Sequence, residues 1–166
     1  MRQGETVYFP GHGISKVESV EQKEFDGASK EVLMLRVASS SMSVMVPKDN
    51  LAVLGIRPVI SKNTTTELMS IISKANGPVK TQSWKDRNKE FLQKIRSGSP
   101  FELAQIIRDL SQLKEQKPLS FCEKRMYETA RRLLGEEIAH VRKEKCDKVF
   151  TQIDVLSNGN GNGRKH

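Results

Sequence analysis

The sequence predicts an α+β protein in which a small antiparallel β-barrel module precedes a compact all-helical domain of about five helices. Short stretches rich in Val, Leu, Met and Phe fill the first third of the chain, and turn-forming residues separate them. Capping residues and a helical apolar period replace these signals in the remainder. The net charge of +8 divides at the same place, because residues 1–57 hold seven Lys or Arg and seven Asp or Glu. We expect a β module over 1–60, a helical domain over 61–155 and a disordered tail over 156–166.

Four strands are predicted in the β module. They are ETVYFP, GISKVESVEQKEF, EVLMLRV and MSVMVP, separated by the turn-forming sequences PGHG, DGAS and SSS. The dipeptide Asp26-Gly27 between two apolar stretches indicates a β-hairpin. Pro47 ends the last strand, and the KDNLAVLG segment after it is predicted to form a short helical turn. Short, closely spaced strands favour a small antiparallel sheet of the barrel type.

Capping boxes predict where the helices start. In such a box a hydroxyl accepts a hydrogen bond from a free backbone N–H, and an acid three residues later bonds back. Apolar residues at helical spacing follow each box, and a last short helix is expected around Cys146, Val149, Phe150 and Ile153. The segment from 156 is too poor in apolar residues to be buried. The four predicted boxes are Thr64 with Glu67, Ser83 with Asp86, Ser99 with Glu102, and Ser120 with Glu123.

The sequence carries little sign of catalytic or metal chemistry. Its three histidines are scattered, and no Cys/His spacing, phosphate loop or nucleophile motif is present, so we expect no metal, cofactor or catalytic residue. An enzyme whose site assembles from distant residues is the alternative. Cys122 and Cys146 are expected to be free thiols of a cytoplasmic protein, with a single disulfide as the alternative. No apolar run approaches the ~18 residues of a membrane span, and no secretory signal is expected.

The basic half predicts a polyanionic partner, most often a nucleic acid, although a merely solvated basic surface would give the same charge. The only tryptophan, Trp84, stands at the start of the basic segment SWKDRNKEFLQKIRSG. At this position Trp84 could fold onto Phe91 or remain exposed for contact with a partner. The residues alone leave both interpretations open.

Several stretches resemble the CarD/CdnL family of bacterial transcription regulators. They are VYFPGHGISKVESVE, MSVMVP, SWKDRNKE, IIRDL and LSFCEKRMYETARRLLGEEI, in order from about residue 3 to about residue 150. The resemblance implies that the first module is a Tudor-like barrel that docks on the RNA polymerase β subunit, sheet edge against sheet edge. It implies that the helical domain contacts promoter DNA at the upstream edge of the bubble and stabilises the open complex, notably at ribosomal RNA promoters. A stand-alone architectural nucleic-acid-binding protein is the alternative function.

The resemblance also implies site residues, with a tryptophan at Trp84 inserted into the minor groove. Met45 and Lys23 stand where some members have arginine, so the polymerase contact is expected to be more apolar and less ionic. Asp86 replaces a basic residue of some members, and a monomer is expected. The implied DNA-binding residues are Trp84, Arg87, Lys89, Leu92, Phe121, Lys124 and Arg125, and the implied polymerase-binding residues are Lys23, Met45, Val46 and Pro47.

Overall fold

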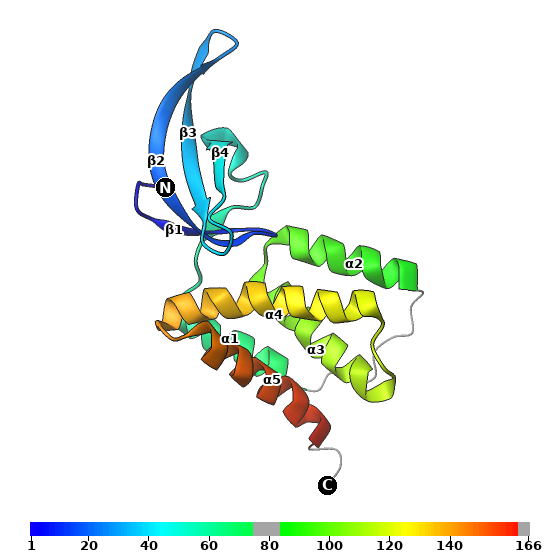
Figure 1. The fold of residues 1–166 in the computed structure, drawn as a ribbon. Helices are drawn as coiled ribbons and strands as arrows, with labels where there is room; N and C mark the ends of the chain where they lie inside the picture. The colour runs from blue at the N-terminus through cyan, green and yellow to red at the C-terminus, as the bar shows by residue number, and fades with distance from the viewer. Residues whose placement is uncertain (75–83, 163–166) are drawn as a thin grey trace. The chain divides into compact units, whose positions relative to one another are not determined.

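The chain folds into two compact units, Met1–Val59 and Ile60–His166 (Figure 1). The computed structural model describes residues 1–74 and 84–162, with side chains described over 1–74 and 85–158. The first unit is a β-sheet and the second is helical, which confirms the predicted fold class.

The first unit is a five-stranded antiparallel sheet with the order β4-β3-β2-β1-β5. The four predicted strands are present, and a 3-10 helix at Lys48–Asn50 follows β4, where a helical turn was predicted. The fifth strand was not predicted, because its two residues are too few to show an alternating pattern. The strands are β1 (Thr6–Phe9), β2 (Gly13–Phe25), β3 (Ala28–Val37), β4 (Ser43–Pro47) and β5 (Arg57–Pro58).

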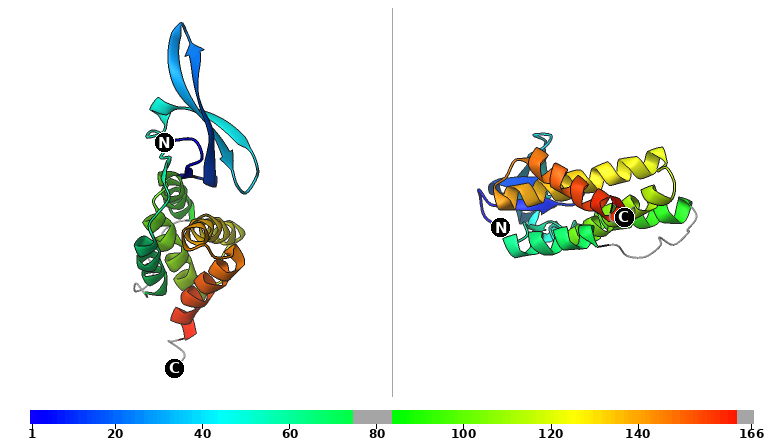
Figure 2. Two further views of the ribbon diagram at one scale, coloured as in Figure 1. Left: turned by 90° about the vertical axis from the view of Figure 1, so that its left-hand side faces the viewer. Right: turned by 90° about the horizontal axis from the view of Figure 1, so that it is seen from below.

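Strands β2 and β3 form a long, curved hairpin (Figure 2). Asp26 and Gly27 both have positive φ, 51° and 80°, as the two-residue loop of a type I′ turn requires, so the predicted hairpin is confirmed. The residues Glu21–Phe25 before this turn are exposed, and the hairpin therefore extends beyond the core of its unit. That core consists of Val7, Phe9, Val17, Leu33, Leu35, Val46 and Ile56.

The second unit contains five helices within the described residues. Helices α3 and α4 bury apolar stripes at helical spacing, and α1 and α5 pack against them, as the period predicts. Helix α2 packs mainly against α3 and α4. The helices are α1 (Lys62–Ser73), α2 (Trp84–Ser97), α3 (Pro100–Gln116), α4 (Phe121–Arg142) and α5 (Cys146–Asn162).

The chain enters the helical unit at a fixed point. The backbone N–H of Ile60 donates to Glu137 Oε2 at 2.9 Å, and Glu137 is completely buried on α4. A carboxylate in this position is stabilised by the donors that face it, because an isolated charge would be strongly disfavoured away from water. The first residue of the unit is therefore held against its longest helix.

The helix starts agree only partly with the predicted capping boxes. The box of Ser120 and Glu123 is complete, with both reciprocal hydrogen bonds. Helix α1 starts earlier than predicted, because Ser61 is its N-cap and accepts from the Thr64 N–H at 3.2 Å. Ser99 occupies the N-cap of α3 without a side-chain capping hydrogen bond, and the Glu102 carboxylate accepts from the Ser97 hydroxyl and not from the Ser99 N–H. The predicted box at Ser83 and the predicted stop at 76–78 lie outside the described residues.

The last helix is longer than predicted, and the expected disordered tail does not start at 156. Ser157 is 1% exposed and lies four residues after the buried Ile153, so it continues the same helical face. Its hydroxyl is 3.1 Å from the Tyr127 hydroxyl, which ties α5 to α4. Polar contacts therefore stabilise this end of α5, where the sequence has too few apolar residues to predict a helix.

Both cysteines, Cys122 and Cys146, are exposed and free, as expected. Among the helices of 1–74 and 84–162, none combines the length and the apolar character that crossing a membrane requires.

Candidate nucleic-acid interface

A buried ion pair joins α2 to α4. The Arg87 Nη1 lies 3.1 Å from Glu123 Oε2, and the two side chains are 8% and 5% exposed. A charge-assisted hydrogen bond between two desolvated partners is stronger than a neutral one. This pair therefore fixes the start of α2 beside the start of α4.

Glu123 has a second role in the capping box of α4. Its Oε1 accepts from the Ser120 N–H at 3.0 Å, and its own N–H donates to the Ser120 hydroxyl at 3.2 Å. Burial raises the pKa of Glu123, but the hydrogen bonds from Ser120 and Arg87 outweigh burial and lower the pKa below its usual value. Glu123 is thus ionised at neutral pH, with one oxygen bound to the cap and the other to Arg87.

Exposed cationic and apolar side chains lie on the two helices that this ion pair joins. Leu92 on α2 is 41% exposed and Phe121 on α4 is 73% exposed, although both are large and apolar. The Arg125 guanidinium carbon lies 5.8 Å from the centre of the Phe121 ring, within cation–π range. We call this set the α2–α4 patch, and its described members are Lys89, Leu92, Phe121, Lys124 and Arg125.

The structure places five of the seven residues implied to bind DNA as exposed side chains on α2 and α4. Trp84 is the first residue of α2, three residues before Arg87, and its side chain lies outside the described part of the structure. Arg87 differs from the others, because it is buried and paired with Glu123. Its geometry favours a structural role in holding α2 and not a direct phosphate contact.

The helical spacing of α2 indicates that Arg87 is buried, although an arginine is normally expected at the surface. Arg87 precedes Phe91 by four residues, so the two share one face of α2, and Phe91 is buried. Its positive charge instead suggested an exposed residue that contacts DNA. The partner carboxylate lies 36 residues away in sequence, which no local pattern can reveal.

The residues implied to bind polymerase lie on two parts of the sheet. Met45, Val46 and Pro47 lie on β4, an edge strand, whereas Lys23 lies in the exposed outer half of β2 and opposite Lys30. Met45 is 44% exposed, but the Val46 side chain is part of the core. Val46 can therefore reach a partner only through its backbone.

The backbone of β4 presents hydrogen-bonding groups at the sheet edge. The Val37 N–H donates to the Met42 carbonyl at 2.8 Å, where the β3–β4 hairpin closes. Antiparallel ladders alternate, so Ser43, Met45 and Pro47 occupy the pairs whose backbone groups point away from β3. Pro47 has no N–H to present, and Met45 therefore supplies the N–H near the centre of this edge.

The His, Cys, Asp and Glu side chains are dispersed over the part of the chain that the structure describes. There, no three His, Cys, Asp or Glu side chains come close enough together to hold a metal ion. His12 lies edge-on to Phe9, with ring centres 4.6 Å apart, in the turn between β1 and β2.

The two units match two family models, in the order in which they occur in the chain. Residues 1–60 match the CarD-like/TRCF RID domain, and residues 67–154 match the CarD C-terminal domain. An RID-type sheet followed by a CarD-type helical domain defines a CarD-like transcription factor.

A relative of similar length extends the comparison over most of the chain. The Bacillus subtilis (strain 168) protein named "Putative transcription factor YdeB" is 31% identical over 149 residues, which is 89% of this chain and 97% of the relative. The chain belongs to the CarD family of transcription factors, which confirms the resemblance seen in the sequence.

Proposed function

We propose that this protein bridges RNA polymerase and promoter DNA. Its sheet binds the polymerase β subunit, and its helical unit binds DNA at the upstream edge of the bubble and stabilises the open complex. The observation that carries this proposal is the pairing of an RID-type sheet that has an accessible edge strand with a basic helical unit that carries the α2–α4 patch.

Polymerase binding is proposed to occur by addition of a strand to β4. Main-chain hydrogen bonds supply much of the affinity in this mode, and alternate side chains supply specificity. Met45 offers an outward backbone N–H and an exposed thioether side chain, which suits an apolar partner surface. Lys23 and Pro47 lie outside the core and flank this contact in the proposal.

We expect Met45→Pro to weaken polymerase binding while leaving the fold intact. The proline ring removes the outward N–H and obstructs an added strand, yet it breaks no ladder bond to β3. Loss of one intermolecular hydrogen bond together with the steric block should weaken binding by about tenfold or more. The measurement is affinity of the full chain for the isolated β subunit, with thermal unfolding as the check on folding. Met45→Leu, which retains the N–H, is the matched control, and equal binding by both variants would contradict strand addition.

DNA binding is proposed to combine phosphate contacts with an apolar wedge. Lys89, Lys124 and Arg125 are exposed and can neutralise about three phosphates, so the log–log salt slope should be about −3. Such contacts carry no base information, and binding should be nearly independent of sequence. Trp84 is proposed to enter the minor groove at a distorted base step, with Leu92 and Phe121 completing the apolar part of the contact. Arg87 serves this interface by positioning α2.

We expect the protein to lengthen open-complex lifetime on a ribosomal RNA promoter, and Trp84→Ala to remove most of that effect. Loss of an aromatic contact with a base step should reduce the stabilisation by about 1–3 kcal/mol. The measurement is decay of the open complex after addition of a competitor, with and without each variant. Phe101→Ala, which removes an exposed aromatic residue outside the α2–α4 patch, is the control. A collapse in thermal stability of Trp84→Ala would instead identify Trp84 as a core residue.

A further inference from the structure

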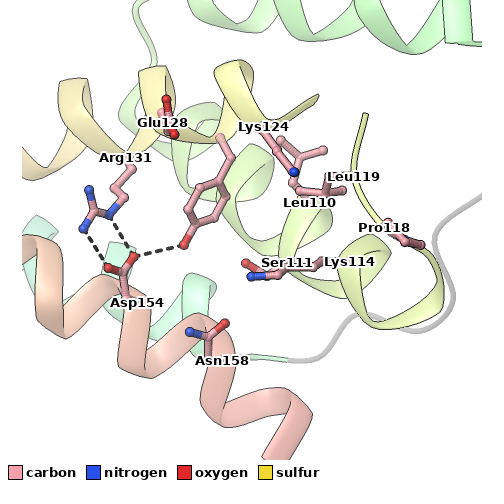
Figure 3. Close-up of a pocket in the computed structure, with 11 residues that line it drawn as sticks. Leu110, Ser111, Lys114, Pro118, Leu119, Lys124, Glu128, Arg131, Asp154 and Asn158 are labelled. Atoms are coloured by element: carbon pink, nitrogen blue, oxygen red, sulfur yellow. Dashed lines mark hydrogen bonds and ion pairs between the residues drawn. The ribbon is translucent and has the colours of Figure 1, made fainter. Parts of the chain in front are cut away.

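The helical unit contains a cavity of about 530 Å³ between α3, α4 and α5 (Figure 3). This volume lies within the range of small-molecule sites in proteins. Leu110, Pro118, Leu119 and the ring of Tyr127 form the apolar part of its lining. The cavity can therefore remove a flat or compact apolar group from water.

One wall of the cavity is fixed and electrically neutral. Arg131 binds Asp154 with two hydrogen bonds, Nε to Oδ1 at 2.8 Å and Nη2 to Oδ2 at 2.6 Å (Figure 3). The Tyr127 hydroxyl donates to Asp154 Oδ1 at 3.2 Å. Burial raises the pKa of Tyr127, so the hydroxyl stays protonated at neutral pH and remains a donor. Asp154 is thus satisfied by its neighbours and attracts no further cation.

The charge left over in the cavity is positive. Lys114 on α3 and Lys124 on α4 both line it and are both exposed. Neither ammonium group makes a hydrogen bond or ion pair with another residue of the described segments. Glu128 is the other carboxylate of the lining, because Asp154 is already paired with Arg131. Two lysines against one glutamate leave an excess of positive charge over an apolar floor.

We propose that this cavity binds a small organic anion. The aromatic or short aliphatic body of the ligand lies against Leu110, Leu119 and Tyr127, and its carboxylate or phosphate group pairs with Lys114 and Lys124. A neutral apolar molecule would leave the two ammonium groups without a partner. A bare inorganic anion would leave the apolar lining in water. A ligand that is both apolar and anionic satisfies the two halves of the site together.

The position of Lys124 gives the site a regulatory consequence that rests on the proposed function. Lys124 belongs to the α2–α4 patch as well as to the cavity. A bound anion neutralises Lys124 and withdraws it from the DNA phosphates, so ligand and duplex should each weaken the binding of the other. Lys114 lines the cavity from α3 and is not part of the patch. A substitution of Lys114 therefore tests anion binding without removing a proposed DNA contact.

The site is tested by titrating the isotopically labelled full chain with naphthyl phosphate and following amide chemical shifts by NMR. We expect saturable shifts confined to the segments of α3, α4 and α5 that line the cavity. Naphthol, which lacks the anionic group, and inorganic phosphate, which lacks the apolar group, should each bind more weakly by about tenfold or more. Lys114→Ala should weaken the binding of naphthyl phosphate by a similar factor. Lys117→Ala, which removes an exposed lysine just outside the lining, should leave the affinity unchanged.

Several results would overturn the proposal. They are the absence of saturable shifts up to the solubility limit of the probe, equal binding of naphthol, or equal weakening by Lys117→Ala and Lys114→Ala. The titration contains no DNA, so its outcome is independent of the proposed function. The regulatory consequence is then read from duplex affinity with and without naphthyl phosphate. The probe should weaken duplex binding by the wild-type chain and have little effect on duplex binding by Lys114→Ala.

Discussion

Glu123→Gln is expected to release α2 from α4 and to weaken duplex binding together with stability. Glutamine retains the capping box, because its single carbonyl oxygen can accept from the Ser120 N–H. Its amide NH₂ group then faces the Arg87 guanidinium, so that two hydrogen-bond donors oppose each other. Both side chains are nearly inaccessible to water, so water cannot satisfy these donors. Breaking a buried pair by removing one charge typically costs about 3–5 kcal/mol. The effect on the described structure should be concentrated in α2.

The measurements for Glu123→Gln are thermal unfolding, hydrogen exchange of the α2 amides and affinity for a duplex. Ser120→Ala is the matched control, because it removes the capping hydroxyl, which is worth about 1 kcal/mol, and keeps the ion pair. Arg87→Met tests the pair from the other side without touching the cap. If Glu123→Gln is no more harmful than Ser120→Ala, the ion pair does not hold α2.

The same pair should make α2 sensitive to acid. The pKa of Glu123 is lower in the folded chain than the usual value of 4.5. Its contribution to stability is therefore fully present above that value and is lost as the pH falls through the lowered pKa. The protection factors of the α2 amides, which are corrected for the intrinsic pH dependence of exchange, should be insensitive to this group near neutral pH and should fall in acid. In Glu123→Gln this acid-dependent step should be absent.

Gly135→Leu is expected to separate α5 from α4 and to destabilise the helical unit. A Cβ atom built at Gly135 would lie 2.4 Å from Phe150 Cε1 and 2.5 Å from Phe150 Cδ1, closer than any real contact. The Phe150 ring also lies under the Arg131 guanidinium, 4.9 Å from ring centre to Cζ, which restricts how far it can move. Overpacking of this kind costs about 1–3 kcal/mol or more, and the gain in helix propensity offsets at most about 1 kcal/mol.

A second substitution separates overpacking from other effects at Gly135. In the double variant Gly135→Ala/Phe150→Leu the smaller side chain on α5 leaves room for the added methyl group. The two changes should therefore be less destabilising together than the sum of the single variants. Urea unfolding of the four proteins gives this coupling energy. Simple additivity would mean that the close approach of Gly135 and Phe150 has no energetic consequence.

The sequence predicts those features of the fold that depend on neighbouring residues. The Asp26-Gly27 turn and the Ser120–Glu123 box are set by local conformational preferences, and both are confirmed. The start of α1 was misplaced because Ser61 and Thr64 both offer a capping hydroxyl, and local preference does not separate them. Strand β5 has two residues and is defined by its pairing with β1. It is too short to show an alternating pattern of apolar and polar residues.

The candidate site shows the same division. The exposed members of the α2–α4 patch follow from the resemblance and from a basic composition, and they lie on the two helices that the Arg87–Glu123 ion pair joins. The role of Arg87 did not follow, since it depends on a carboxylate distant in sequence. The cavity of α3, α4 and α5 was also beyond sequence reasoning, because three separate helices contribute its lining and no single segment carries its signature.

The hydrogen bond from Ile60 to Glu137 bears on how the two proposed contacts reinforce each other. The sheet unit ends at Val59 and the helical unit begins at Ile60, whose N–H is already tied to α4, so little free chain connects them. In the proposed function, docking of the sheet on polymerase through so short a tether would make the DNA contact an intramolecular event at high effective concentration. We then expect a patch with three exposed cations to be occupied on the promoter even at a low affinity for free duplex. Lengthening the connection after Val59 with a flexible insert would dilute that advantage and leave each separate affinity unchanged.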